Sequence, residues 1–77
     1  MYQFLGFKNT KIDGTDFYNV SVLYSDDNNC NYSVLRMFII ANDENKTKLN
    51  YFNKHDEIDD YIAFKVKHDG KISITLK

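Results

Sequence analysis

Lysine, arginine and aromatic residues recur in the strand-like segments of this chain, and this combination is the one in the sequence best suited to binding a ligand. Proteins that hold single-stranded nucleic acid use cations for the phosphates and aromatic rings on which bases stack, at about 1–3 kcal/mol per base. In the closing segment, YIAFKVKHDGKISITLK, side chains alternate between an apolar face and a face with Lys65 and Lys67. The residues expected to contact phosphates are Lys8, Lys11, Arg36, Lys65, Lys67 and Lys71, and those expected to stack on bases are Tyr32, Phe38 and Tyr61.

The same residues have a second interpretation, which the sequence leaves open. Lysines on the outer strands of a sheet stay solvated and discourage strand-to-strand aggregation. On this interpretation Tyr32 and Phe38 belong to a core or to a dimer interface. The chain carries ten basic and eleven acidic residues, for a net charge of −1. Binding to a polyanion would therefore be weak and strongly salt-dependent.

The segment HDEIDD, residues 55–60, concentrates carboxylates around one imidazole. A calcium loop of the EF-hand type needs a glycine and regularly spaced oxygen ligands, which this segment lacks. We therefore expect a solvated acidic loop and no metal site. An acidic patch of this kind also suits a basic partner, or imitates the phosphates of a nucleic acid.

Candidates for nucleophilic catalysis are few. Cys30 lies in an Asp/Asn-rich turn without a neighbouring histidine, and acidic neighbours disfavour the reactive thiolate. His55 and His68 show no catalytic spacing, and the three glycines are dispersed rather than gathered in a phosphate-binding loop. We expect a protein that is not an enzyme and that uses no cofactor.

Length and composition indicate a single folded domain. The 77 residues are 43% hydrophobic and include six Tyr and six Phe, which is enough for a core. No apolar stretch approaches the roughly 20 residues that cross a bilayer, and the start, MYQFLGFKNT, does not resemble a signal peptide. One cysteine allows no internal disulfide, so we expect a reducing, cytoplasmic location without membrane contact.

The elements that must position these side chains are strands. Alternating apolar residues and Asp/Asn/Gly turns predict the order strand, strand, strand, short connector, strand, strand. Turns are expected at Asp13-Gly14, at Asp26–Asn31 and around Asp69-Gly70. A short helix or turn is expected over residues 49–54. The expected strands cover residues 2–12, 17–25, 32–41, 61–67 and 71–77.

This order predicts a mainly β domain, a small five-stranded OB-like Greek-key barrel with the short helix or turn between the third and fourth strands. The alternative is an SH3-like barrel or another small, curved antiparallel sheet. Alternation assigns the third strand's core face to Leu35, Met37 and Ile39. The core face of the closing hairpin is expected to comprise Ile62, Phe64, Val66, Ile72, Ile74 and Leu76.

The pattern from YQFLGFKNTKIDGTDFYNVSVLY through an apolar third strand to DGKISITLK resembles a known group. It is similar to the small OB-fold, gene-V-like single-stranded DNA-binding proteins of filamentous phages and their relatives on plasmids and conjugative elements. The resemblance is one of pattern and covers most of the chain. It implies a barrel that binds single-stranded DNA, although this chain is slightly acidic where the group is basic.

Three functions follow as expectations. The first is a single-stranded nucleic-acid-binding protein of a phage or mobile element. The second is a protein–protein module, such as a small phage inhibitor of a host enzyme or defence system, and the third is a structural subunit. Aromatic residues on both faces of one strand leave a small sheet under-covered, so we also expect a homodimer.

Overall fold

The computed structural model describes residues 1–26, 28 and 31–77. Asp27, Asn29 and Cys30, half of the polar turn predicted at Asp26–Asn31, lie outside this part of the chain. The described part is mainly β, as predicted. Its elements are the strands β1 (Tyr2–Ile12), β2 (Thr15–Asp26), β3 (Asn31–Ile40), β4 (Ile62–Val66) and β5 (Ile72–Leu76), the helix α1 (Asp43–Tyr51) and a 3-10 turn at Asp59–Tyr61.

The first three strands form an antiparallel meander in the order β1-β2-β3. The predicted turn between β1 and β2 is confirmed: Asp13 and Gly14 have φ of 50° and 79°. Two positive φ values give a turn whose twist matches that of the flanking strands, which is why Asp-Gly is favoured there. The register shifts between Phe4 and Gly6, so β1 carries a bulge.

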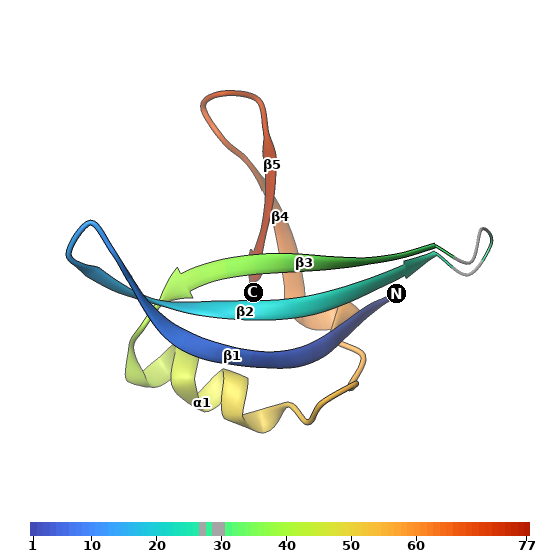
Figure 1. Cartoon of the computed structure of the whole chain (residues 1–77), viewed down its shortest axis with the longest axis horizontal. Helices are drawn as coiled ribbons and strands as arrows, with labels where there is room; N and C mark the ends of the chain where they lie inside the picture. Colours follow the sequence, from blue (N-terminus) through green and yellow to red (C-terminus); the bar gives the residue numbers. More distant parts are fainter. Residues whose placement is uncertain (27, 29–30) are drawn as a thin grey trace.

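The core lies between one face of this sheet and α1 (Figure 1). The predicted core face of β3 is confirmed, since Met37 and Ile39 are buried and Leu35 is half-buried. From the helix side, Leu49 and Phe52 meet this face. The opposite face of the sheet is covered by no helix in the described structure.

The helix begins earlier than the predicted range of residues 49–54. Asn42 caps it, because the Asn42 side chain accepts a hydrogen bond from the backbone N–H of Asn45 at 2.8 Å. Asp43 and Glu44 in the first turn also favour this end of the helix. The first turns are polar throughout, which is why hydrophobic periodicity failed to reveal them.

The prediction of a solvated acidic loop over residues 55–60 is confirmed for its histidine and its four acidic residues, which are exposed, and is corrected for Ile58 and for the backbone of residues 55–58. Their backbone runs along the outer edge of β1: the N–H of Phe4 donates to the carbonyl of Asp56 at 2.9 Å, and the N–H of Ile58 donates to that of Tyr2 at 2.9 Å. Ile58 is fully buried, whereas its acidic neighbours are exposed. Burial, followed by the neighbouring Tyr24 and Asp59, raises the pKa of the Tyr2 phenol.

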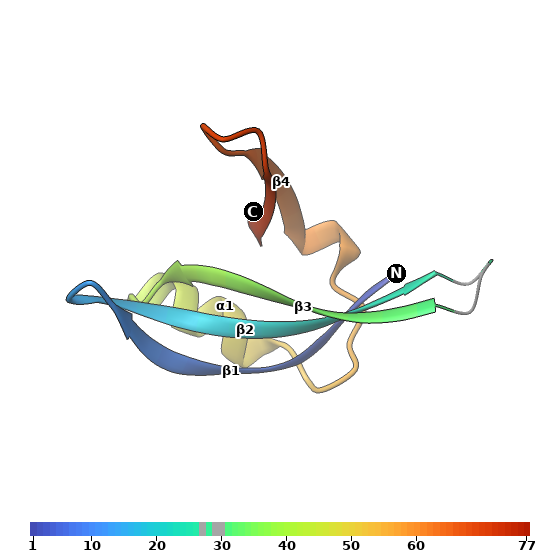
Figure 2. The same cartoon turned by 45° about the horizontal axis from the view of Figure 1, so that its top comes forward.

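The closing hairpin forms as predicted, but it does not complete a barrel. β4 and β5 pair only with each other, and β5 lies beside β3 without a ladder between them. The hairpin stands away from the three-stranded sheet (Figures 1 and 2). The predicted closed barrel is therefore wrong for the part of the chain that the structure describes.

The hairpin does not complete a barrel because only one of its two ends packs on the core. Its base packs on the core through Ile62, which is 5% exposed, and through the half-buried Leu76. Its outer half is poorly covered: Phe64, Val66 and Ile72 are 56%, 75% and 70% exposed, and of the three only Phe64 has a ring contact, with Tyr2 at a centroid distance of 6.1 Å. These three residues were predicted to face the core, and this part of the prediction is corrected.

Candidate nucleic-acid interface

A groove of about 450 Å³ lies between β3 and the closing hairpin. We call it the β3–hairpin groove. Four of the nine residues expected to contact nucleic acid line it: Arg36 and Phe38 from β3, and Lys65 and Lys67 from β4 and the start of the following turn. The other lining residues are Leu35, Ile72, Ser73, Ile74 and Thr75.

The groove is cationic. Arg36, Lys65 and Lys67 line it, and no Asp or Glu does. None of the three is in a salt bridge with a described carboxylate. Their charges are thus available to an anion from outside, and a concave surface of one sign concentrates its field on such a ligand.

Phe38 supplies the aromatic surface of the groove. Its side chain is 47% exposed although it lies in the middle of a strand. The register places Phe38 opposite Asn19, and Asn19 opposite Lys8 on β1. Lys8 therefore shares the uncovered sheet face with Phe38, about 10 Å away across two strand spacings. It lies beside the groove rather than in its lining.

The remaining predicted residues are not brought together with these. Lys11 is three positions from Lys8 along β1 and so lies on the opposite face of the sheet. Lys71 lies in the turn at the tip of the hairpin, where its carbonyl accepts from the N–H of Lys67 at 2.8 Å. Tyr32 is 69% exposed near the start of β3, about 13 Å along the strand from Arg36.

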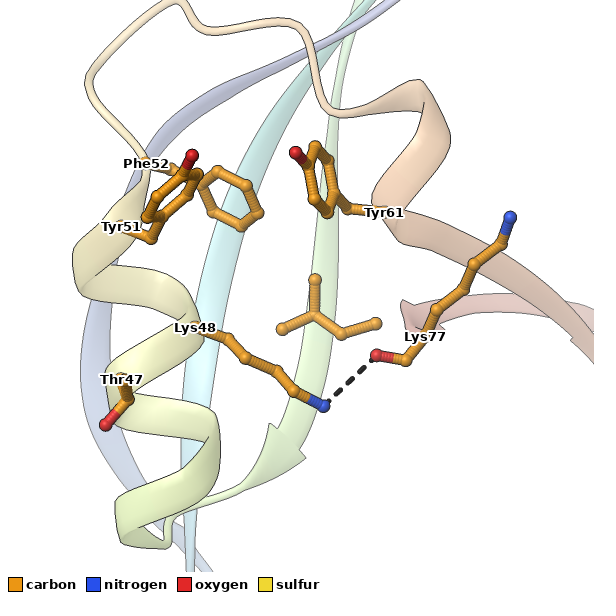
Figure 3. A pocket seen from close by; sticks show the side chains of 7 residues that line it. Thr47, Lys48, Tyr51, Phe52, Tyr61 and Lys77 are labelled. Carbon is orange, nitrogen blue, oxygen red and sulfur yellow. Dashed lines mark hydrogen bonds between the residues drawn. The ribbon is translucent and has the colours of Figure 1, made fainter.

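Tyr61 lies in a second cavity, of about 370 Å³, at the base of the hairpin (Figure 3). We call it the tyrosine pocket. Its lining residues are Thr47, Lys48, Tyr51, Phe52, Tyr61, Leu76 and Lys77. The sequence analysis found only Tyr61 among them. Lys48, Tyr51 and Phe52 follow the spacing that places side chains on one helical face, but the predicted helix started beyond Lys48.

No group of three His, Asp or Glu residues in the described ranges is arranged to hold a metal ion. The exposed acidic residues 55–60 do not converge; His55 instead places Nδ1 at 3.2 Å from Oε1 of Gln3. Among the same residues, no helix is long and apolar enough to cross a membrane. Cys30, which the sequence analysis judged unsuited to catalysis, lies outside the described residues.

Comparisons of the chain with protein-family models, with curated proteins and with solved structures found no match.

Proposed function

We propose that this chain binds single-stranded nucleic acid in the β3–hairpin groove, as a non-enzymatic protein of a phage or mobile element. One observation carries the proposal. Residues about thirty positions apart, Arg36 and Phe38 on one side and Lys65 and Lys67 on the other, converge on one groove that no acidic residue lines. Cations and an exposed ring in a groove are the two parts that sequence-tolerant binding of a single strand requires.

Each side chain has a distinct role in this proposal. Arg36 presents a planar fork of donors, which suits two oxygens of one phosphate. Lys65 lies on β4 and Lys67 directly follows the strand; both line the groove and meet phosphates as point charges. Phe38 offers its exposed ring to a base. Lys8 extends the cationic surface across the sheet and would meet the strand as it leaves the groove.

The arrangement of strands supports the same function. An OB-fold binds oligonucleotides on the face of its second and third strands and with the loops that follow its first and fourth strands. In this chain β5 lies beside β3, and residues 55–58, which lead toward β4, lie beside β1. The neighbours are those of an opened OB-like barrel, and the groove occupies the gap that closure would fill.

Titration of fluorescent oligo(dT) at two salt concentrations tests the proposal. Three phosphate contacts on a single strand give a log–log salt slope of about −2, so binding should weaken by about 20-fold between about 50 mM and about 200 mM salt. Lys65→Gln with Lys67→Gln should reduce the slope by about 1.4. The matched control is Lys46→Gln with Lys54→Gln, two exposed lysines outside the groove.

A second pair of variants tests stacking. Phe38→Ala should weaken oligo(dT) binding by about tenfold or more. Ile40→Ala is its control, because Ile40 is 49% exposed on the same face of β3 and does not line the groove. Equal losses in the two variants, or no binding at the lower salt, would rule out this groove as the site. Complete absence of binding would favour the alternative that the surface recognises a protein.

We also propose that the chain forms a symmetric homodimer through its exposed apolar surface. Val34, Val66 and Ile72 are 62%, 75% and 70% exposed. A two-stranded hairpin is marginal in water unless it packs against another element. A second copy offers the same unpaired surface, which is the condition for a twofold interface. Light scattering at high concentration should give twice the 9.1 kDa chain mass, and Val66→Ser with Ile72→Ser should restore the monomer mass.

A further inference from the structure

Three aromatic rings shape the tyrosine pocket. The ring of Phe52 lies between those of Tyr51 and Tyr61, with centroid distances of 6.1 Å and 5.1 Å and interplanar angles of 76° and 69°. Phe52 is 9% exposed and forms the floor, whereas Tyr51 and Tyr61 are 74% and 47% exposed and form the walls. Figure 3 shows the two hydroxyl groups pointing to the same side of the pocket.

The volume and the lining of the pocket indicate the aromatic part of a ligand. About 370 Å³ lies near the lower end of the range of small-molecule sites and accommodates a ring system with one substituent. Aromatic walls favour a flat aromatic ring, which gains stacking and edge contacts in such a space. Leu76 closes the side that faces β5 and adds a further apolar contact.

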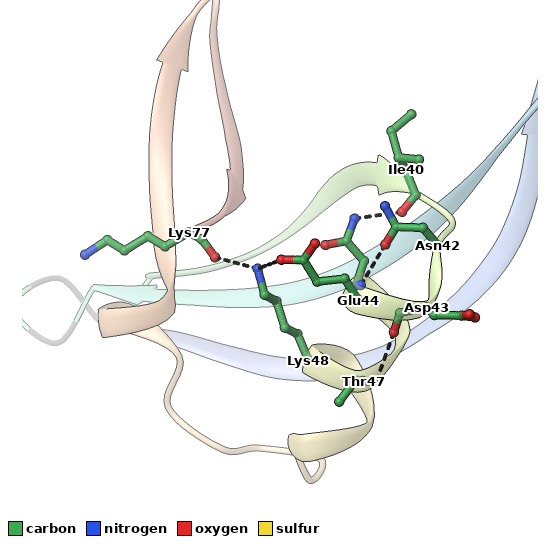
Figure 4. Close-up of polar contacts among 8 residues, drawn as sticks. Ile40, Asn42, Asp43, Glu44, Thr47, Lys48 and Lys77 are labelled. Atoms are coloured by element: carbon green, nitrogen blue, oxygen red, sulfur yellow. Dashed lines mark hydrogen bonds and ion pairs between the residues drawn. The ribbon is translucent and has the colours of Figure 1, made fainter.

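Lys48 indicates the charge of the rest of the ligand. Its Nζ donates to the backbone carbonyl of Lys77 at 3.1 Å and lies 3.5 Å from Oε1 of Glu44 (Figure 4). An ammonium group has three N–H donors, and these contacts use two of them. The third donor favours an anionic group at this rim, where Lys77 is a second lysine of the lining and Glu44 offsets part of the Lys48 charge. A cationic ligand, which aromatic walls alone would also suit, is disfavoured by this ammonium.

We infer that the tyrosine pocket binds one nucleotide, with its base among Tyr51, Phe52 and Tyr61 and its phosphate at Lys48. The choice of a nucleotide over other aromatic anions rests on the proposed function. β5 lines the β3–hairpin groove with its residues 72–75 and the tyrosine pocket with Leu76. Adjacent residues of one strand therefore line the two sites, and a free nucleotide carries the same chemistry as the end of a bound strand.

Calorimetric titration with thymidine monophosphate, and with thymidine as the uncharged counterpart, tests the site. We expect saturable binding of the nucleotide and weaker binding of the nucleoside. Tyr51→Ala and Lys48→Met should each weaken nucleotide binding by about tenfold. Glu44→Gln should strengthen it about twofold, because it removes a carboxylate that competes for the ammonium. The matched control is Lys46→Met, on the same helix and outside the pocket, which should leave binding unchanged.

Oligonucleotides distinguish the two sources of the nucleotide. If the pocket holds the end of a strand, a terminal phosphate should tighten oligo(dT) binding and thymidine monophosphate should compete with it. If it holds a free nucleotide, the terminal phosphate should have no effect. Phe38→Ala should retain nucleotide binding, so failure of the groove proposal leaves this site measurable. No saturable nucleotide binding, or equal affinity for thymidine, would overturn the inference.

Discussion

Asn19 and Phe38 lie opposite each other on β2 and β3, on the sheet face that α1 leaves uncovered, yet their surroundings differ sharply. Asn19 is 7% exposed and Phe38 is 47% exposed. The Oδ1 atom of Asn19 is buried and has no hydrogen-bond partner among the described residues. A polar atom is therefore buried beside an apolar ring that is half in water.

This relationship predicts a stabilising substitution. A buried unsatisfied acceptor costs about 1–3 kcal/mol, and valine suits a central strand. Asn19→Val should raise the free energy of unfolding by about 1 kcal/mol, measured as a higher urea midpoint. Asn9→Val, at an exposed position of β1, should change the midpoint little. A lower midpoint for Asn19→Val would show that the amide has a stabilising partner in solution.

The role of residues 55–58 as a cover for the edge of β1 depends on Ile58, which is 0% exposed. Ile58→Val should lower the free energy of unfolding by about 0.5–1.5 kcal/mol, because it removes one buried methylene. Ile40→Val is the same chemical change at a side chain that is 49% exposed, and it should cost less than about 0.5 kcal/mol. Equal effects of the two substitutions would contradict the burial of Ile58.

The cap of α1 gives a third prediction. Asn42→Ala removes the acceptor for the N–H of Asn45 and should destabilise the chain by about 0.5–2 kcal/mol. Asn50→Ala, at an exposed position near the other end of the helix, should be neutral or slightly stabilising, because alanine is the better helix former. Thermal unfolding followed by circular dichroism measures both. A helix that begins at residue 49 would be indifferent to the first substitution.

Substitutions at two glycines with nearly equal backbone geometry distinguish an effect on stability from an effect on oligo(dT) binding. Gly14 and Gly70 have φ of +79° and +81°, and at neither would an added Cβ meet another atom within 4 Å. Alanine should therefore cost about 1–2 kcal/mol at each position through backbone strain alone. Only Gly70→Ala strains the turn that follows Lys65 and Lys67, so it should also weaken oligo(dT) binding. Similar weakening by Gly14→Ala would count against the groove.

The strands and the turn at Asp13-Gly14 could be predicted because their signals are local. Alternation with a period of two fixes which side chains share a face, and this correctly placed Arg36 and Phe38 away from the core of β3. Asp-Gly encodes its own turn, because few other residue pairs adopt two positive φ values. In these segments the local preference and the tertiary contacts agree.

The placement of the hairpin could not be predicted in the same way. Its alternation predicts one apolar face, but only Ile62, Ile74 and Leu76 reach the core, because the chain has already used the edge of β1 for residues 55–58. The tyrosine pocket is equally non-local. It exists where the end of α1 meets Tyr61 and Leu76, and no spacing along the sequence encodes that meeting.

The attachment of the hairpin has a mechanical consequence. Tyr61 and Leu76 line the tyrosine pocket and also lie at the base from which β4 and β5 project. A ligand that separates Tyr61 from Phe52 would rotate the β4–β5 hairpin about this base. The tip of the hairpin, with Lys67 and Lys71, would be displaced furthest. The width of the β3–hairpin groove would then depend on whether the tyrosine pocket is occupied, and the hairpin would couple the two sites.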